Sequence, residues 1–439
     1  MYFDLPSRRD LQRFALSFLI NVLLAVPCFA QTDPGPRSGS PGAGGPVNGL
    51  SASATLTAVF QKGLSVFQEA EAVADGLGPR FNSNSCVSCH TQPAAGGSSP
   101  ASNPQVRFAN SQNTLPSFIT SNGPVREARF VHKPDGTPDG GVHALFTIGG
   151  RADEPVGCNL AQENFSNLSN IIFRIPTPTF GLGLIEAIPD TTLAQNVSQS
   201  ANSTLGIRGV LNRNGNDGTV TRFGWKAQNK TLLLFSGEAY NVEMGITNLI
   251  FNTERDETPN CSPVAPPNSI FNVGGFTDQN VFDDITNFAN FMRFLAPPTP
   301  GPSNNNVVQG SNQFVNIGCA NCHSPTLTTG ASPFPPLANQ VIHPYSDFAL
   351  HHMGPGLADQ VSQGLAGGDQ FRSAPLWGLG QRLFFLHDGR TTDLLQVIRD
   401  HSSLGNSQFP SSEANAVVSN FFRLSSADQQ NILIFLRSL

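Results

Sequence analysis

The sequence has 439 residues and a mass of 46.7 kDa, which is enough for roughly two to three domains, and its 39% hydrophobic residues allow a sizeable core. A formal net charge of −6 and a pI near 5.8 exclude a general nucleic-acid binder, which needs a basic face. The 42 Gly and 34 Pro residues predict a loop-rich fold of short elements. The 33 Phe residues against 3 Tyr predict apolar walls that a large flat cofactor can use.

The N-terminal segment has the pattern of an export signal. Three Arg residues precede an apolar run over 14–26, and a small-x-small cleavage pattern ends at Ala30. The run is too short to span a bilayer comfortably, and no later segment reaches about 18 apolar residues. We therefore expect 1–30 to be a cleaved signal peptide of a periplasmic or secreted bacterial protein without a transmembrane segment; a retained anchor is the alternative. The Gly, Pro and Ser content predicts a flexible leader over 31–53.

Helical periodicity marks three segments of the mature chain. They are 54–74, 283–295 and 426–439, each with apolar residues recurring on one face. A Ser at 425 or 426 can cap the last of them.

Two short motifs carry the strongest signal. CVSCH at 86–90 and CANCH at 319–323 share the C-x-x-C-H pattern, in which two thiols can add to the vinyl groups of one haem and the His can bind its iron. A thioredoxin-like pair needs a βαβ pattern, which is absent, and a zinc site leaves the repeated His unexplained. The sequence therefore predicts two covalently attached haem c groups. Their attachment and proximal residues are Cys86, Cys89 and His90, and Cys319, Cys322 and His323.

Two cysteines remain outside the motifs and the signal peptide. In an exported protein an even remainder indicates a disulfide. We therefore expect a bond between Cys158 and Cys261, with two free buried thiols as the alternative.

The two halves of the chain share a further pattern. Gly63-x-x-x-Phe67 precedes the first motif and Gly310-x-x-x-Phe314 precedes the second. Phe81 and Phe314 each stand five residues before the first Cys of their motif. This repetition indicates two cytochrome c-like modules.

A linker composition separates these modules. The stretch 296–306 is rich in Pro, Gly and Asn. We therefore predict a mainly α fold with long irregular loops and little β structure. Its parts are an N-terminal haem domain over 54–296 and a C-terminal haem domain over 307–439.

Segments outside the motifs identify a family resemblance. They are HALFTIGGRADEPVGC at 143–158, FGLGLIEAIPD at 180–190, RFGWKA at 222–227, EMGITN at 243–248, LHHMGPGLAD at 350–359 and APLWGLGQRLFFLHDGRT at 374–391. In order and spacing they resemble the bacterial di-haem oxidoreductases of the peroxidase type, formerly called thiol-oxidoreductase-like, and more distantly the di-haem cytochrome c peroxidases. The resemblance implies an oxidoreductase in which one haem reacts with peroxide while the other relays electrons.

A sixth ligand for the second haem is predicted at His401. Leu394, Ile398 and His401 recur at helical spacing, so His401 falls on a buried face where iron can partner its imidazole. The resemblance agrees, because the relatives carry a sixth ligand here, commonly Met; a His should give a lower potential. A hydrogen-bonded His at a helix end is the alternative. Structural roles are favoured for His351 and Met353.

The first haem is less clearly assigned. His143 lies within the segment that resembles the family, and it is our choice of sixth ligand if the protein supplies one. His132 and Met244 are the other candidates. An open site is the alternative, and an open site permits O–O chemistry.

Two further residues take their roles from the resemblance. The stretch around Glu243 resembles the peroxidase segment whose Glu lies on the peroxide side of the first haem. A carboxylate with a raised pKa in an apolar pocket can take a proton from peroxide and return it to the leaving oxygen. Trp225 resembles the Trp between the haems that carries electrons. A surface Glu and a core Trp are the alternatives. Candidates for neutralising haem propionates are Arg222, Arg382 and Arg390.

Together these features predict a periplasmic di-haem c-type oxidoreductase that reduces hydrogen peroxide. Its electrons would come from a small redox protein such as a cytochrome c or a cupredoxin. The alternatives are an electron-transfer cytochrome without peroxide turnover and a haem enzyme that oxidises a partner protein or a small organic donor. Related peroxidases also hold calcium between their domains; no Asp-x-Asp cluster appears here, so calcium stays an open alternative.

Overall fold

The computed structural model describes residues 31–39, 42–110, 112–201, 203–270 and 282–439. The predicted signal peptide, 1–30, lies outside these residues. Within the described chain, short helices and irregular loops predominate, and the paired strands form four two-stranded antiparallel sheets. This confirms a helical, loop-rich fold with little β structure. No helix in this part of the chain combines the length and apolar character needed to cross a membrane.

The α-helices of the described chain are short. They are α2 (Ala54–Phe67), α3 (Cys86–Cys89), α4 (Leu182–Glu186), α5 (Asp190–Ser200), α6 (Leu232–Met244), α7 (Asp284–Phe294), α8 (Asn305–Asn316), α9 (Leu394–Asp400), α10 (Asn415–Arg423) and α11 (Ser426–Ser438). The helices expected over 283–295 and 426–439 are confirmed to within a residue. The helix expected over 54–74 ends earlier, at Phe67, because the chain turns away so that Glu71 N can donate to Asn84 O over 2.7 Å.

The strands contribute small local pairings. β1 (Arg80–Phe81) pairs with β3 (Phe146–Thr147), β2 (Glu127–Phe130) with β4 (Ile171–Arg174), β5 (Leu327–Thr328) with β6 (Val341–Ile342), and β7 (Leu350–His352) with β8 (Gln370–Arg372). In the β2–β4 ladder, Glu127 stands opposite Arg174. This ladder and the β7–β8 pair carry residues that surround the site described below.

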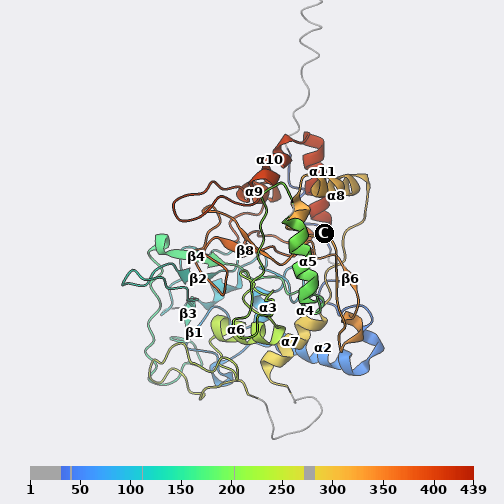
Figure 1. Cartoon of the computed structure of the whole chain (residues 1–439). Helices are drawn as coiled ribbons and strands as arrows, with labels where there is room; N and C mark the ends of the chain where they lie inside the picture. The colour runs from blue at the N-terminus through green and yellow to red at the C-terminus, as the bar shows by residue number, and fades with distance from the viewer. Residues whose placement is uncertain (1–30, 40–41, 111, 202, 271–281) are drawn as a thin grey trace, which may run out of the picture.

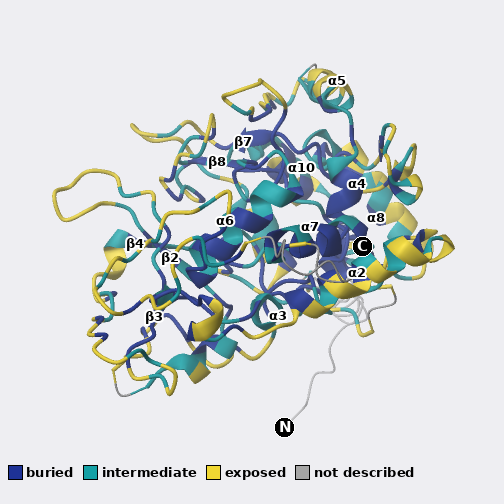
Figure 2. Cartoon of the chain, turned by 90° about the horizontal axis from the view of Figure 1, so that it is seen from below, coloured by how far each residue is buried: buried dark blue, intermediate teal, exposed yellow. Residues whose placement is uncertain are grey.

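Two packed helix pairs organise the molecule: α2 with α7, and α8 with α11. Figure 1 shows the first pair toward the bottom of the molecule and the second toward the top. Figure 2 shows that buried segments gather around α6 and α7, while exposed loops occupy the rim. Each pair stands beside one of the two C-x-x-C-H motifs.

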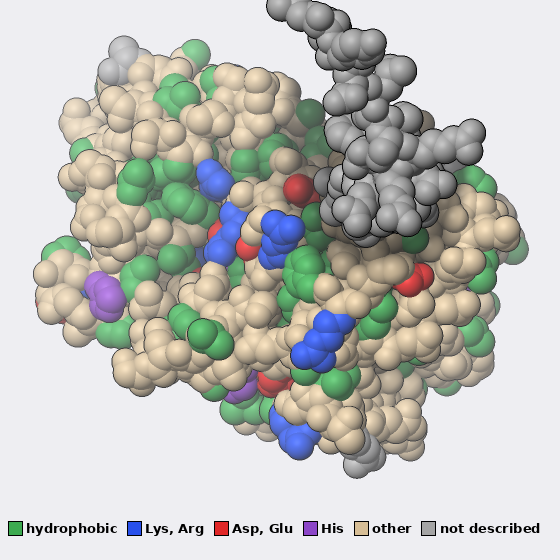
Figure 3. Space-filling model, turned by 90° about the horizontal axis from the view of Figure 1, so that it is seen from above, with side chains coloured by type: hydrophobic (Ala, Val, Ile, Leu, Met, Phe, Trp, Pro, Cys, Tyr) green, Lys and Arg blue, Asp and Glu red, His purple; other side chains and the backbone are tan. Residues whose placement is uncertain are grey.

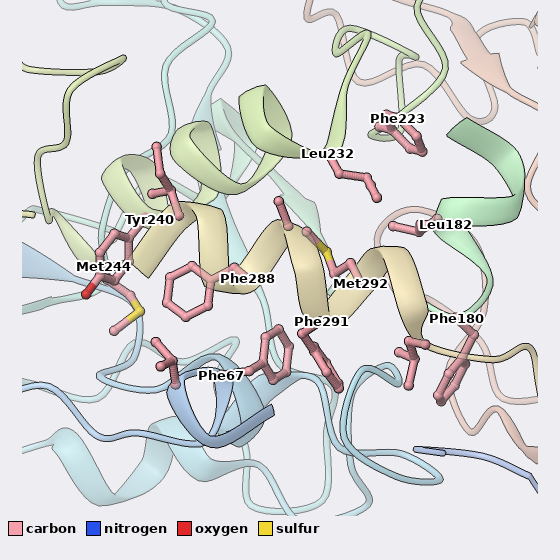
Figure 4. Close-up of a cluster of buried hydrophobic side chains, with 14 of the residues drawn as sticks. Phe67, Phe180, Leu182, Phe223, Leu232, Tyr240, Met244, Phe288, Phe291 and Met292 are labelled. Carbon is pink, nitrogen blue, oxygen red and sulfur yellow. The ribbon is translucent and has the colours of Figure 1, made fainter. Parts of the chain in front are cut away.

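In the first pair, a glycine permits a close helix crossing. A Cβ on Gly63 would lie 2.6 Å from the backbone oxygen of Asn287 in α7. One helical turn later, the Phe67 ring lies 4.7 Å from the Phe291 ring and 6.2 Å from the His90 ring. Figure 4 shows the aromatic side chains gathered around α7 in this core. The helix pair therefore fixes one wall beside the first motif.

The second pair repeats this arrangement. A Cβ on Gly310 would overlap the backbone oxygen of Asn431 in α11. The Phe314 ring lies 5.4 Å from the Phe435 ring and 6.4 Å from the His323 ring. The two Gly-x-x-x-Phe patterns therefore have the same packing role in the two halves of the chain.

The counterpart of Phe314 is Phe67 and not Phe81. Phe81 belongs to β1, and its ring packs 5.3 Å from Phe108 and 6.2 Å from Phe146. Its equal distance from the motif in sequence is misleading, because the first half inserts a loop and a strand between its helix and its motif. Contact with the motif His depends on the helix face and not on the residue count.

Replacing Gly310 with Ala should lower the free energy of unfolding by about 1–3 kcal/mol, because the added methyl group forces α8 away from α11. Gly215→Ala is a matched control, since nothing lies within 4 Å of a Cβ at Gly215 and its φ lies outside the left-handed region. Urea unfolding followed by circular dichroism measures both variants. Equal stability of the two variants would show that the crossing tolerates a side chain.

The predicted flexible leader is instead packed against the protein. Asp33 and Arg437 form an ion pair of 2.6 Å that is less than 10% exposed. Val47 N donates to Phe294 O over 2.8 Å, and Leu50 is fully buried in the core. Composition suggested flexibility, but these long-range contacts hold 31–39 and 42–53 in place. The cores also cross the expected domain boundary: Ile207 packs with the second helix pair.

Candidate functional site

Each C-x-x-C-H motif lines its own cavity. The first cavity has an empty volume of about 1170 Å³, its open mouth included, and the second has about 1440 Å³. The first cavity is lined by Cys86, Cys89, His90, Trp225, Tyr240 and Glu243, among others. The second is lined by Cys319, Cys322, His323, Trp225, His387 and His401, among others. Both are large enough for a flat cofactor, and most of their lining is apolar.

The motif histidines are oriented as metal ligands. His90 Nδ1 lies 3.0 Å from the Gly97 carbonyl oxygen, and His323 Nδ1 lies 2.9 Å from the Tyr345 carbonyl oxygen. A carbonyl accepts only from a protonated nitrogen, so Nε2 of each ring keeps its lone pair. Burial lowers the pKa of each imidazole to about 4, which keeps both rings neutral. Neutral imidazoles with a free Nε2 can bind iron.

The motif thiols do not have the character of a redox pair. Within the described chain, Cys86, Cys89, Cys319 and Cys322 form no disulfide. Burial raises the pKa of Cys89 and of Cys319 to about 12, whereas reactive redox thiols have a lowered pKa. The described residues contain no group of three or more His, Cys, Asp or Glu side chains able to hold a metal ion, so neither a zinc nor a calcium cluster stands out.

A buried guanidinium in the second cavity lacks a partner. Among the described residues nothing hydrogen-bonds to Nε or Nη2 of Arg382, and burial lowers its pKa to about 10. Such a cation suits a carboxylate, as a haem propionate would supply. The other two candidate arginines are paired elsewhere. Arg222 bonds to Asp190, and Arg390 to Asp388, and neither arginine lines a cavity.

His401 reaches the second cavity as expected. It follows α9, and its Nδ1 lies 2.7 Å from the Val397 carbonyl oxygen, which leaves Nε2 free as in the motif histidines. Burial lowers its pKa, and a charge on His401 would further lower the pKa of His323. The two imidazoles are therefore close enough to interact. This placement suits two ligands of one iron.

The other imidazoles near the second cavity have different surroundings. His351 is engaged at both nitrogens, with Nε2 3.0 Å from Asp347 and Nδ1 2.9 Å from Glu413. That pairing fits a structural role. His387 is buried and stacks on Phe371, with ring centroids 4.4 Å apart. Met353 also lines the cavity.

The structure does not bring His143 to the first cavity. Its Nε2 lies 2.9 Å from Asp139, and its Nδ1 lies 3.6 Å from Glu163. Burial lowers the pKa of His143, but the two carboxylates outweigh this and raise it overall. Because both nitrogens face anions, the expected ligand role has no support in this geometry. Met244, one of the other predicted candidates, does line the first cavity, and so does Met292, which no sequence pattern marks as a ligand.

Glu243 lies in the wall of the first cavity. It stands near the end of α6, one turn after Tyr240, so both side chains share the cavity face of the helix. Among the described residues its carboxylate has no hydrogen-bond partner. Burial, helped by the charges of Glu127 and Glu238 and opposed by Arg129, raises the pKa of Glu243 to about 8. A carboxyl group of this kind can exchange a proton near neutral pH.

Trp225 lies between the two cavities and lines both. Its indole Nε1 donates to the Ile175 carbonyl oxygen over 3.0 Å, and its own carbonyl oxygen accepts from Arg372 N over 2.9 Å. Its ring meets the His387 ring edge-on, with centroids 6.4 Å apart. The resemblance predicts a Trp between the two sites at this position, and the place of Trp225 in both cavity walls is consistent with that prediction.

Cys158 and Cys261 are joined by a disulfide with a Cα–Cα distance of 4.7 Å. It links the loop that follows β3 to the loop that follows α6. The loop that follows α6 begins directly after Glu243 and Met244. The bond therefore ties down a segment close to the first cavity.

The family described as "Di-haem oxidoreductase, putative peroxidase" matches residues 129–439. A comparison with curated proteins gives no match. A MauG-like protein associated with microbial copper homeostasis is 14% identical, with a TM-score of 0.29 over 60% of this chain and 90% of its own. Hydrazine synthase of Kuenenia stuttgartiensis is 12% identical, with a TM-score of 0.28 over 60% of this chain and 88% of its own. A variant of the diheme peroxidase BthA from Burkholderia thailandensis is 12% identical, with a TM-score of 0.29 over 65% of this chain and 91% of its own. Such low TM-scores support no structural argument.

Proposed function

Because the chain belongs to the di-haem oxidoreductase family, we propose that it is an exported c-type enzyme that reduces hydrogen peroxide with electrons from a small redox protein. The observation that carries the proposal is the position of Trp225, which lines both cavities, together with that of Glu243, which lines only the first. Two sites joined by an aromatic ring suit a reaction in which electrons enter at one site and are consumed at the other.

The cavities would hold two haem groups through the motif residues. The bound haems would supply the iron that exchanges electrons with the donor and with peroxide. The thiols would anchor each macrocycle, and Nε2 of His90 and His323 would point at the metal. Arg382 would bind a propionate of the second haem.

The two sites would differ in the ligands that the protein supplies. His401 and His323 both line the second cavity, so that site suits electron transfer. With His143 turned toward carboxylates, no histidine besides His90 lines the first cavity among the described residues. Met244 is the remaining candidate ligand there, and we assign peroxide to this site because Glu243 lines it.

At the first site, Glu243 would move the proton. Its carboxylate would take a proton from one peroxide oxygen and return it to the other. The oxygen that receives the proton then leaves as water. Overall, two electrons and two protons convert one hydrogen peroxide into two waters. The carboxylate has no competing hydrogen bond among the described residues, which leaves it free for this exchange.

The donor would dock near the second site. The second cavity is walled by α9, α10 and α11. Figure 3 views that end of the molecule from above and shows Lys and Arg side chains near the middle of the face, with Asp and Glu side chains beside some of them. A small redox protein with a complementary mixed charge pattern would suit this face.

The proposal is tested by peroxide-dependent oxidation of a reduced donor by the holoprotein. The protein is assayed fully oxidised and again after one-electron reduction. Catalytic turnover in either state supports a peroxidase. No turnover in both states, with two haems bound, would favour an electron-transfer cytochrome instead.

Replacing His401 with Met should raise the reduction potential of one haem and leave the other nearly unchanged, because a thioether stabilises reduced iron more than an imidazole does. Spectroelectrochemical titration of the holoprotein measures both potentials. His352→Met is a control, because His352 bonds to Asp369 and lines neither cavity. An unchanged potential in the His401 variant would mean that His401 does not bind iron.

A further inference from the structure

A buried ion cluster lies next to Trp225 and has no part in the steps above. This charge cluster consists of Arg174, Lys226 and Asp359. Arg174 Nη2 lies 2.6 Å from one Asp359 oxygen, and Lys226 Nζ lies 2.9 Å from the other. The Arg174 side chain is 3% exposed and the other two are fully buried. Two cations thus share one anion away from water.

The charge cluster touches the walls of both cavities. Arg174, at the end of β4, itself lines the first cavity. The Lys226 ammonium lies 4.0 Å from the ring centre of Phe371, which lines the second cavity and stacks on His387. Lys226 also follows Trp225 directly in the chain. The cluster therefore lies alongside the route between the two sites.

The groups around Lys226 include two carbonyl oxygens and one further carboxylate. Lys226 Nζ also donates to the carbonyl oxygens of Gly367 at 2.8 Å and Gly368 at 3.3 Å, which carry no net charge. Asp369, directly before β8, faces Lys226, partly offsets its charge and is bonded to His352 at 3.0 Å. Burial lowers the pKa of Lys226 to about 8, against the attraction of Asp359, so the ammonium is charged at pH 6.

Each oxygen of Asp359 has its own cation. Both bonding nitrogens of Arg174 reach Oδ2, and Lys226 supplies the charge at Oδ1, where Val361 N also donates. Burying each ion carries a desolvation cost that this pairing offsets. The two positive charges also border the neighbouring cavities and act on them electrostatically.

We propose that the charge cluster controls electron transfer between the two cavities by raising the reduction potentials of both haems and keeping Trp225 in its neutral, reduced state. A fixed cation in a region of low dielectric stabilises whichever neighbouring state carries less positive charge. Each transfer moves one electron from the reduced second site to the oxidised first site, and no bond forms or breaks. The inference rests on the proposed function in requiring two bound haems.

The test measures both haem potentials in the holoproteins of Lys226→Met and Arg174→Met at pH 6. Each variant leaves Asp359 paired with one remaining cation, so the fold should survive. Both variants should lower both potentials. Arg174→Met should lower the first potential more, because Arg174 lines that cavity. Lys226→Arg, which keeps the charge, should stay close to the wild type.

Arg222→Met is the matched control, because Arg222 is a buried arginine paired with Asp190 that lines neither cavity. It should lower stability without moving either potential. Potentials in the Lys226 and Arg174 variants that equal those of the control, or that rise, would overturn the proposal. If one of the two variants fails to fold, the haem potentials of the other variant test the proposal. These titrations need no peroxide, so failure of peroxide turnover would leave their outcome intact.

Discussion

Replacing Glu243 with Gln is expected to lower kcat/KM for hydrogen peroxide by about 10²–10⁴-fold, the usual contribution of a positioned acid and base. Gln has nearly the same shape but can neither accept nor return the proton. Because α6 keeps its length and the side chain keeps its volume, haem content and stability should change little. Stopped-flow and steady-state assays of the holoprotein measure the effect.

The pH profile gives an independent signature of Glu243. Burial raises the pKa of this carboxyl to about 8, so most molecules carry the protonated form at neutral pH. Since the deprotonated form is the base, kcat/KM should rise with pH, by about tenfold per unit well below the pKa, and level off above it. The Gln variant should lose this rise.

Glu238→Gln is the matched control within the same cavity. Glu238 also lines the first cavity, but its carboxylate accepts hydrogen bonds from Gln228 and Asn229. Removing this nearby charge should lower the pKa of Glu243 slightly and leave the maximal rate nearly unchanged. If Glu243→Gln stayed within a few-fold of the wild type across the pH range, the acid and base role would be wrong.

Replacing both Cys86 and Cys89 with Ala is expected to reduce the covalent haem content from two per chain to one and to abolish peroxide turnover. In the proposed function these thiols would anchor the macrocycle at the site where Glu243 would act, so the second haem alone would remain, able to accept electrons but not to reduce peroxide. Intact mass under denaturing conditions counts the attached haems. Activity is assayed in parallel.

The other cysteine pair supplies the control for this experiment. Cys158→Ser with Cys261→Ser should keep two attached haems but lower the free energy of unfolding by about 2–5 kcal/mol. The bond closes a loop with a sequence separation of 103, which is long enough for a large effect on the unfolded chain. Two attached haems in the Cys86 and Cys89 variant would contradict covalent attachment through this motif.

The family of this chain could be predicted from its sequence, and the match over 129–439 confirms it. The largely helical character of the fold and the helices α7 and α11 could also be predicted from the sequence. The arrival of His401 in a cavity also followed from helical spacing. Covalent haem attachment and the division into two haem domains stay predictions.

Other features could not be read from local pattern. His143 sits in a segment that resembles the family, yet Asp139 and Glu163 hold its ring away from the first cavity. The leader has the composition of a flexible chain, yet Asp33 is bound to Arg437 at the far end of the sequence. Asp139 stands only four residues before His143, but Glu163 and Arg437 lie far from their partners in the sequence, where no local pattern identifies them.

The difference between the features that the sequence predicts and those that it does not has a physical cause. A C-x-x-C-H motif spans a single turn, so covalent geometry alone brings its thiols and imidazole together, and an amphipathic helix shows its buried face through its own period. Long-range packing places Trp225 in the walls of both cavities. It also brings Arg174 next to Asp359, which is 185 residues away in the sequence. Burial and ion pairing depend on which distant segments meet. Local residue chemistry thus defined the family and the candidate cofactor, while the folded chain defined the path between the two sites and the charges beside it.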